Sequence, residues 1–302
     1  MSVDAARPLV CRYAGPRIRL VDGHAHLLPA VPAPTGMICG RFSVLSPGTE
    51  RRHLYATTGF DGPRHAGYMT FGGDHSAGWV LAAVPHGACF DPSTGGTITA
   101  PPGTRIQAAA VARFQQMAVL GLDQVPAGVS LDDAVVVGSG PVALGCALEL
   151  RRRGAARIQV LTGRRQPPIS YAPGVECASV ISRGRTALVI DAAGTPRRAA
   201  RLLTPRGTLG LLGTPALGGR LSSLLIHRSG WTVVGMHELS AAATRRYQDA
   251  YTAAATWLNG LPPDLVDSWC HLVPGTQAPA LYAGLDGPRS PEPVVIFSWE
   301  VS

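Results

Sequence analysis

From Ala134 onward, short uninterrupted apolar runs alternate with glycine turns and segments of helical pattern. AVVV at 134–137 is followed by GSGPVALGCALELRRRG, and later apolar runs are IQVLTG, ALVIDAAG, RAARLLTPRG, TLGLLGT and WTVVGMHE. Continuous apolar strands separated by helices are typical of a parallel sheet that is covered on both faces. The pattern therefore predicts an α/β fold with a Rossmann doubly wound parallel sheet over residues 126–259.

The first part of the chain has a different rhythm. Residues 8–104 combine glycine and proline turns with short apolar runs, which predicts a β-rich domain with irregular loops over residues 1–125. Helices are expected at Ile106–Leu122 and at Ser240–Leu258, with Ser240 as the N-cap of the second. The tail from residue 260 ends in the apolar run PVVIFSW and is expected to return to the first domain.

Composition removes several function classes. The net charge of +8 comes from arginine alone, because the 302 residues include no lysine, and Schiff-base chemistry is therefore excluded. With abundant Ala, Gly and Pro this composition indicates a GC-rich genome, so the charge does not argue for nucleic acid. We interpret the clusters Arg151–Arg153 and Arg245–Arg246 as solvated helix faces rather than a phosphate-binding stripe. No apolar stretch approaches the ~20 residues of a membrane span and no secretory signal is recognised, so we expect a cytoplasmic protein with no nucleic-acid or membrane partner.

The six cysteines do not form a metal-binding spacing. They stand at positions 11, 39, 89, 146, 177 and 270, and none forms a C-x-x-C pair. We expect reduced, mostly buried thiols and no structural zinc.

A glycine turn carries the clearest chemical signal. Gly138-Ser139-Gly140-Pro141-Val142-Ala143 fits G-x-G-x-x-[GA], directly after an apolar strand and at the start of a helix. The glycines permit a tight turn and close approach of a pyrophosphate to the helix N-terminus, where Pro141 costs little. We predict a dinucleotide site; the alternatives are a Rossmann-like domain that has lost its cofactor, or a chance turn.

The end of the second strand favours NADP(H) over NAD(H). NAD-binding domains usually place a carboxylate there, whereas this chain has Thr162-Gly163-Arg164-Arg165. A 2′-phosphate could bind Arg164 or Arg165 and the Thr162 hydroxyl. The alternative is two solvent-exposed arginines in an arginine-rich chain.

Nearly the whole chain resembles the medium-chain dehydrogenase/reductase (alcohol dehydrogenase-like) family. The resemblance is carried by ALVIDAAGTPRRAARLLTPRGTLGLLGTP, WTVVGMHE, PLVCRYAGPRIRL and ICGRFSVLSPGTERR. It implies a GroES-like catalytic domain, a cofactor held between the two domains, and cofactor contacts at Ala193, Gly213 and Thr214. It also implies dimerisation through the strand near Trp231–Met236, giving a homodimer.

The departures from the family indicate loss of the catalytic zinc. Pro47-Gly48-Thr49-Glu50 stands where zinc-dependent members have Cys-Gly-Thr-Asp, and Gly67-Tyr68-Met69 stands where they have Gly-His-Glu. Pro47 and Tyr68 cannot replace a thiolate and an imidazole as ligands, and the structural-zinc loop is missing. Cys39 and Cys89 lie outside the ligand motif, and His24 and His26 are interpreted as surface residues. We predict no metal, as in the zinc-independent S-P-G-T-E subset of the family.

Without zinc, side chains must hold the substrate oxygen and relay the proton. The resemblance places Thr49 at the hydroxyl position that contacts the substrate, and Tyr68 in the same cavity. His86 and Glu50 complete the predicted catalytic set. Thr49 and Glu50 could instead fix their loop, Tyr68 could be a core aromatic, and His86 a structural histidine. Other histidines are unranked candidates: His53, His65, His75 and His271.

The sequence therefore predicts an NADP(H)-dependent, zinc-independent oxidoreductase that interconverts an alcohol and a carbonyl. Its short length for the family suggests an open cleft, suited to a natural-product or peptide substrate as well as a small molecule. A speculative version oxidises a β-hydroxy acid to a β-keto acid that then loses CO₂. The alternatives are an NADPH-dependent enoyl or quinone reductase and a catalytically degenerate dinucleotide-binding scaffold or sensor.

Overall fold

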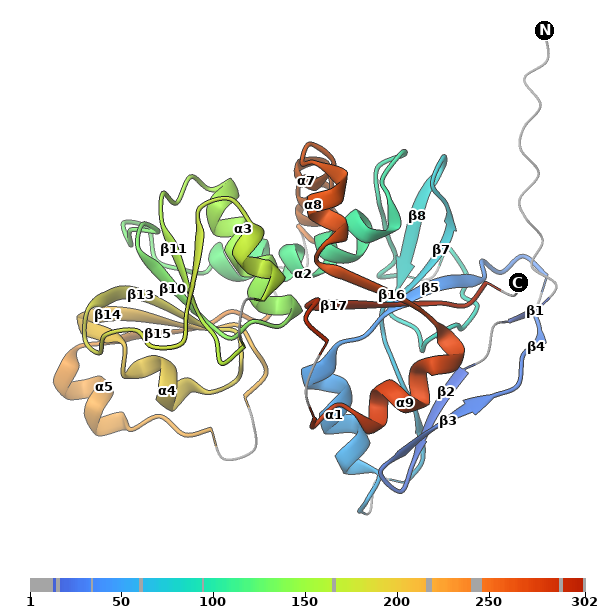
Figure 1. The fold of residues 1–302 in the computed structure, drawn as a ribbon, viewed down its shortest axis with the longest axis horizontal. Coiled ribbons are helices and arrows are strands. Elements are labelled where there is room, and N and C mark those ends of the chain that lie inside the picture. The colour runs from blue at the N-terminus through green and yellow to red at the C-terminus, as the bar shows by residue number, and fades with distance from the viewer. Residues whose placement is uncertain are drawn as a thin grey trace, which may run out of the picture.

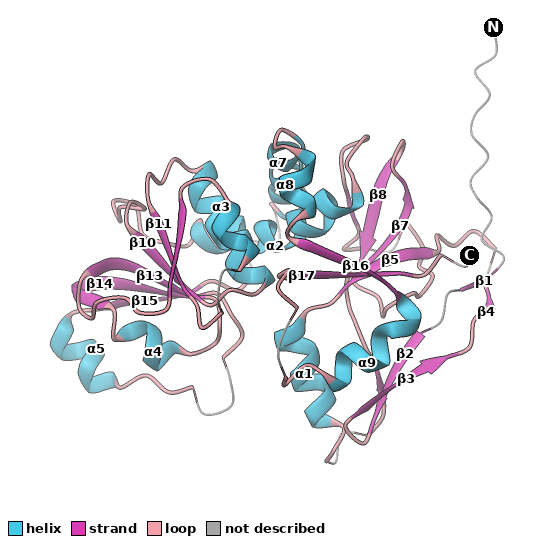
Figure 2. Cartoon of the chain, in the orientation of Figure 1, coloured by secondary structure: helices cyan, strands magenta, loops and turns pink. Residues whose placement is uncertain are grey.

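The computed structural model describes residues 13–14, 17–33, 35–59, 62–93, 95–164, 167–215, 219–239, 246–287 and 290–300. Two six-stranded sheets dominate the molecule, and helix α2 (Ile106–Leu122) lies between them (Figure 1; Figure 2). Across these ranges, no helix has both the length and the apolar character needed to cross a membrane.

The first sheet is parallel throughout, with strand order β12-β11-β10-β13-β14-β15. Its strands are β10 (Ala134–Val137), β11 (Ile158–Leu161), β12 (Val175–Ala178), β13 (Thr186–Asp191), β14 (Leu203–Leu211) and β15 (Thr232–Gly235). Renumbered along the chain, the order reads 3-2-1-4-5-6, the Rossmann arrangement, whose topological switch point lies between β10 and β13. The predicted α/β fold with a doubly wound parallel sheet is confirmed.

Five further helices accompany this sheet and α2. They are α3 (Pro141–Arg152), α4 (Pro196–Ala200), α5 (Ser223–Ser229), α7 (Tyr247–Asn259) and α8 (Pro263–Asp267). Helices α2 and α3 pack closely at Gly145, where an added Cβ would lie 2.4 Å from the carbonyl carbon of Phe114. The bounds predicted for α2 are confirmed. Helix α7 begins at Tyr247, and the predicted N-cap Ser240 lies outside the described residues.

The second sheet combines the two ends of the chain, in the order β16-β17-β5-β7-β8-β9. Its strands are β5 (Gly40–Val44), β7 (Thr70–Asp74), β8 (Gly78–Ala82), β9 (Ile98–Thr99), β16 (Cys270–Pro274) and β17 (Val294–Ser298). Strand β17 pairs parallel with β16 and antiparallel with β5, and Figure 1 shows these red and blue strands side by side. The tail therefore returns to the N-terminal sheet, while the domain limits at residues 125 and 259 stay predictions.

Smaller elements complete the fold. They are β1 (Tyr13–Ala14), β2 (Arg17–Val21), β3 (His24–Leu28), β4 (Val31–Pro32), β6 (Arg64–His65), α1 (Pro47–Ala56), α9 (Ala278–Ala283) and two 3₁₀ turns at Pro168–Tyr171 and Gly275–Gln277. Helix α1 corrects the expectation of loops in this stretch. Pro47 fits its first turn, and the Glu50 carboxylate accepts the backbone N–H of Ser46 at 2.8 Å.

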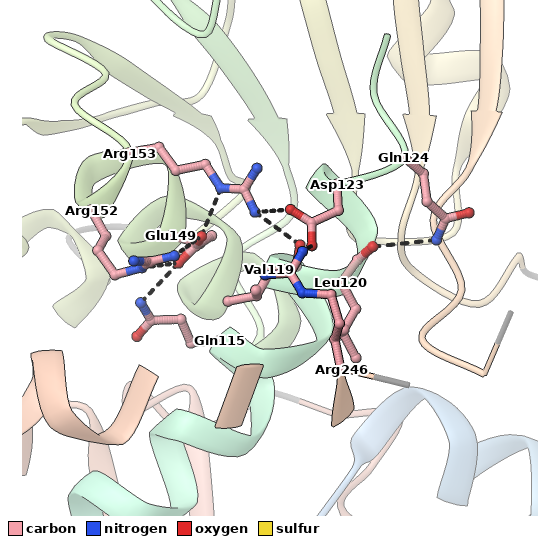
Figure 3. A network of polar contacts seen from close by, with 9 residues as sticks. All are labelled: Gln115, Val119, Leu120, Asp123, Gln124, Glu149, Arg152, Arg153 and Arg246. Carbon is pink, nitrogen blue, oxygen red and sulfur yellow. Dashed lines mark hydrogen bonds and ion pairs between the residues drawn. The ribbon is translucent and has the colours of Figure 1, made fainter. Parts of the chain in front are cut away.

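A polar network ties α2 to α3 and to the start of α7 (Figure 3). The fully buried Glu149 carboxylate accepts Nε of Arg152 and Nε of Arg153, each at 2.7 Å. Arg153 also binds Asp123 at 2.8 Å, and Asp123 binds Arg246. Arg152 therefore pairs within α3, whereas Arg153 and Arg246 also link helices, and all three side chains keep part of their surface in solvent.

Candidate functional site

The glycine turn between β10 and α3 leaves an approach to the helix N-terminus. Gly138 has φ +114°, which an L side chain rarely adopts, and Gly140 is the N-cap residue of α3. A Cβ built on Gly140 would meet no atom within 4 Å, so the backbone faces open space. The first N–H groups of α3 therefore remain approachable by an anion, and Pro141 at the first helical position removes only one of them.

A cavity adjoins this turn and separates it from the C-terminal segment. It encloses about 620 Å³ of empty space, part of it open to solvent. Gly140 and Pro141 form one wall, Leu45 and Pro47 from the N-terminal region another, and the rest comes from α9 and from Ser290 to Val295. Only about 120 Å³ of this space is a cavity that could hold water-sized molecules, so its position rather than its size marks it as a candidate: ligand sites lie preferentially between domains and at topological switch points.

Hydrogen bonds hold residues 162–164, which follow β11, at both ends. The Thr162 hydroxyl donates to Ser139 Oγ at 2.7 Å and accepts the backbone N–H of Arg164 at 3.0 Å. Arg164 lines the cavity, and its Nη1 donates to the carbonyl of Ser290 at 2.7 Å. The structure thus brings Thr162, Gly163 and Arg164 to the glycine turn, whereas Arg165 lies outside the described residues.

One carboxylate in this cavity was missed by the sequence analysis. Glu292 lines the same wall as Arg164 and accepts a hydrogen bond from the Ser290 hydroxyl. Glu292 lies in the C-terminal tail, so no local pattern near the second strand signals it. Two groups of opposite charge therefore share the place where a ribose 2′-substituent was expected.

The remaining predicted cofactor residues lie at the carboxyl ends of the strands, the edge where ligands bind in such sheets. Ala193 follows β13, and its backbone N–H donates to the Asp191 carboxylate at 3.1 Å. Burial raises the pKa of Asp191, and backbone hydrogen bonds from this turn act against the shift. Gly213 and Thr214 follow β14, with Gly213 buried and Thr214 exposed.

Tyr68 lies beside Thr49, whose hydroxyl is predicted to contact the substrate. Its hydroxyl donates to Ser46 Oγ at 2.9 Å, and Ser46 stands between Leu45 and Pro47, which line the cavity. Burial raises the pKa of Tyr68, while the Ser46 and Thr49 hydroxyls and the Arg113 charge act against this. The structure therefore brings Tyr68, Ser46 and half-buried Thr49 together.

A buried ion pair adjoins Tyr68. Arg113 of α2 and Glu238, which follows β15, have side chains only 4% and 12% exposed, and Nη2 donates to Oε1 at 2.7 Å. The guanidinium lies 5.4 Å from the Tyr247 ring centre, and burial raises the pKa of Tyr247 to about 12. The sequence analysis missed this pair, although Arg113 is the only charged residue in the 17-residue α2 and could have been singled out.

His86 and Glu50 belong to a separate, fully buried network. His86 Nε2 contacts Glu50 Oε2 at 2.9 Å, and because a carboxylate only accepts, Nε2 carries the proton. His86 Nδ1 then accepts from Ser43 Oγ at 2.7 Å, and Ser43 accepts the Trp299 indole N–H at 2.7 Å. Tyr282 also donates its hydroxyl to Glu50.

Ser43, His86 and Glu50 have the residue types and contacts of a hydrolytic triad, but all three are 0% exposed. Every ring nitrogen and carboxylate oxygen among them already has a partner. The arrangement supports a positioning role: Glu50 holds Ser46 and the turn that carries Thr49.

Of the other histidine candidates, only His271 contacts a residue of the cavity within the described ranges, because its Nδ1 lies 3.4 Å from Ser290 Oγ. His24, His26 and His65 are exposed on the sheet β3-β2-β6, His53 is on α1, His75 is in the turn after β7, and His271 is on β16. Among the residues that the structure describes, no group of three or more His, Cys, Asp or Glu side chains could hold a metal ion.

Comparisons with known proteins support the fold. No family model matches the sequence, and no curated protein matches it. Solved structures do match, one being galactitol-1-phosphate dehydrogenase from Escherichia coli, with a TM-score of 0.70, 14% identity, and coverage of 94% of this chain and 99% of that one.

Two further structures are similar. Acetophenone reductase from Geotrichum candidum, in complex with NAD, has a TM-score of 0.71 at 10% identity and covers 96% of this chain and 98% of its own. The yhdH oxidoreductase from Salmonella enterica, in complex with NADP, has a TM-score of 0.65 at 15% identity and covers 94% and 99%. At these identities the comparisons establish that the chain has the fold of these dehydrogenases and reductases.

Proposed function

We propose that this chain is an NADP(H)-dependent oxidoreductase that interconverts an alcohol and a carbonyl without zinc. The observation that carries the proposal is the cavity at the switch point of a Rossmann sheet, bounded by the glycine turn, Arg164 and the segment next to Ser46. The likeness to dehydrogenases and reductases that bind NAD or NADP supports it.

The residues present fit a dinucleotide. The turn at Gly138 and Gly140 provides the open backbone that a pyrophosphate requires, and the N-terminus of α3 supplies N–H donors and a positive dipole end. The bond from Thr162 to Ser139 keeps the ends of β10 and β11 in register next to it.

The choice of NADP(H) rests on Arg164. Its guanidinium is held against the Ser290 carbonyl, so it is already ordered at the cavity wall and loses less conformational freedom on binding a phosphate. Glu292 acts in the opposite sense, because a carboxylate repels a 2′-phosphate and can accept from a ribose hydroxyl.

When bound, the reduced nicotinamide supplies a hydride. Tyr68 supplies the proton: its phenol is protonated at neutral pH and turns its hydroxyl from Ser46 to the carbonyl oxygen of the substrate. Thr49 holds that oxygen by a hydrogen bond. Glu50 and His86 act behind them, since Glu50 fixes the backbone of Ser46 and His86 fixes Glu50.

Independence from zinc rests on residue chemistry. Pro47 offers no side-chain donor and is the first residue of α1, and Tyr68 offers a phenol in place of the usual imidazole or thiolate ligand. The substrate class, a natural product or peptide, remains a prediction of the sequence alone.

Binding and turnover test the proposal. Quenching of tryptophan fluorescence should show that NADPH binds at least tenfold more tightly than NADH. Ketone and enone panels with labelled NADPH then separate carbonyl reduction from reduction of a C=C bond. Failure of both nucleotides to bind would leave the scaffold as the better hypothesis.

A set of variants tests the cofactor assignment. Arg164→Ala combined with Arg165→Ala should weaken NADPH binding about 10- to 100-fold and leave NADH binding unchanged, since a charge-assisted hydrogen bond contributes about 1.5–3 kcal/mol. Glu292→Gln should strengthen NADPH binding several-fold. Arg157→Ala is the matched control, because Arg157 is exposed at the opposite end of β11. Unchanged NADPH affinity in the double variant would show that the arginines do not bind the phosphate.

A further inference from the structure

Two cysteine side chains meet in the N-terminal region, away from the cavity. The Sγ atoms of Cys39 and Cys89 lie 3.4 Å apart, in contact but without a covalent bond. Their residues are 8% and 9% exposed, and Met37 and Ala33 pack against them. The two thiols are 50 positions apart in the chain, so the fold and not the local sequence brings them together.

The backbone around them has the register of a cross-strand pair. Ile38 and Phe90 form an antiparallel bridge in which each N–H donates to the other carbonyl, at 2.8 and 2.9 Å. The bridge is isolated, because the Ala88 N–H donates to Pro85 instead of continuing the ladder. Cys39 and Cys89 are the next residues inward, where a continued ladder would place a non-hydrogen-bonded pair with Cα atoms about 4.5 Å apart. Disulfides join Cα atoms about 4.4–6.8 Å apart, so this position can hold one.

The two segments stay close one step further along. An added Cβ on Gly40 would lie 2.7 Å from the Ala88 carbonyl oxygen, which shows that the backbones remain in contact beyond the cysteines. Formation of the bond requires the two sulfur atoms to move from 3.4 Å apart to about 2.0 Å.

We propose that Cys39 and Cys89 form an oxidisable dithiol whose co-substrate is a low-molecular-weight disulfide. One thiol loses its proton and its thiolate attacks the small disulfide, forming a mixed disulfide and expelling one thiolate, which takes up a proton. The second cysteine, as thiolate, attacks the protein sulfur of this mixed bond and expels the other small thiol. The two protein thiols are oxidised to one disulfide and the small disulfide is reduced to two thiols.

The other described cysteines are poorly placed for this reaction. Burial raises the pKa of Cys146 and of Cys270, and burial raises the pKa of Cys177 to about 11. Cys39 and Cys89 are buried as well, and they differ from these three cysteines in having a second sulfur atom in contact.

The bond would fasten two segments that carry the buried network. Cys39 leads into β5, which bears Ser43, and Cys89 follows His86 in the same segment. A disulfide here closes a loop of about 50 residues, which restricts the unfolded chain far more than the folded one. The oxidised protein should therefore melt roughly 5–10 °C higher than the reduced protein.

The experiment treats the native, fully reduced protein with oxidised glutathione and maps it by non-reducing peptide mass spectrometry. We expect two fewer titratable thiols, a cross-link between the peptides containing Cys39 and Cys89, and the rise in melting temperature, all reversed by dithiothreitol. Cys39→Ser should abolish the cross-link and the rise, whereas Cys177→Ser should leave both intact.

Two results would overturn the proposal. One is that Cys39 and Cys89 of the treated wild-type protein both remain open to alkylation by iodoacetamide. The other is that the cross-link joins different cysteines or two chains. Mapping of the wild-type protein decides between these outcomes even if Cys39→Ser does not fold.

Discussion

Replacement of Glu50 by glutamine is a sharp test of the buried network. The change keeps the shape of the side chain and removes only its charge and one acceptor oxygen. In the structure, Oε1 accepts the Ser46 N–H and Oε2 accepts from His86 and from Tyr282. Glutamine offers one oxygen and one NH₂ group, so in either orientation at least one of these three donors faces another donor.

The expected loss of stability follows from the number of donors left without an acceptor. A buried donor left without an acceptor costs about 1–3 kcal/mol, and the bonds that survive lose their charge assistance, each weaker by roughly 1 kcal/mol. We therefore expect Glu50→Gln to lower the free energy of unfolding by about 2–5 kcal/mol. The His86 and Tyr282 side chains, which donate to Glu50, are 0% and 1% exposed, so water cannot easily replace the missing acceptor.

Urea unfolding followed by tryptophan fluorescence measures this loss as a lower midpoint. Glu176→Gln is the matched control, because Glu176 pairs with Arg157 while 58% of its side chain is exposed, and such surface pairs contribute about 0–1 kcal/mol. If Glu50→Gln unfolds at the same midpoint as the control, the carboxylate does not hold this network and its positioning role is refuted.

Three further outcomes are expected. Tyr68→Phe should lower kcat for carbonyl reduction about 10²- to 10⁴-fold and leave NADPH affinity unchanged. The wild-type enzyme should lose activity at alkaline pH as Tyr68, whose pKa burial raises, loses its proton, and the variant should lack this fall in kcat. A variant that keeps the alkaline fall in kcat would contradict the assignment. Burial raises the pKa of Asp191 above 3.8, so its stabilising contribution is present in acid and lost as pH rises. Asp191→Asn should therefore gain in melting temperature relative to wild type as the pH rises above about 4, and a constant difference would refute this. Gly145→Ala should lower the stability of the protein in a thermal melt by about 1–3 kcal/mol or more, because the added Cβ would clash with the Phe114 backbone. Gly235→Ala is the control, because its Cβ would meet no atom within 4 Å. Equal effects of the two variants would show that α2 and α3 can move apart.

Fully buried elements were the easiest to predict. Helix α2 and strand β10 are buried almost along their whole length, so they stand out as apolar runs with clear ends, and their predicted bounds agree with the structure. Helix α1 was not predicted, because Pro47 and Gly48 suggested a turn while the helix depends on Glu50 closing back on Ser46.

Residues that meet through the fold were the hardest to predict. Glu292 reaches the cavity only because β17 returns the tail to the N-terminal sheet, and Glu238 reaches Arg113 only because β15 ends beside α2. The family resemblance placed Tyr68 and Thr49 in one cavity, and in the structure their hydroxyls interact, but burial and pairing decide which groups can exchange protons with solvent. The sequence carried no sign that His86 would be enclosed.

The central place of β17 in the N-terminal sheet also governs how the protein is made. Strand β5 leaves the ribosome early, yet its partner β17 is translated about 250 residues later, a delay of roughly 10–50 seconds at usual synthesis rates. During that time the Rossmann unit can fold on its own, while β5 exposes an open strand edge that is prone to pairing with other chains. The N-terminal sheet is therefore the last to close, and a nascent chain halted before Val294 would be released with that edge unprotected.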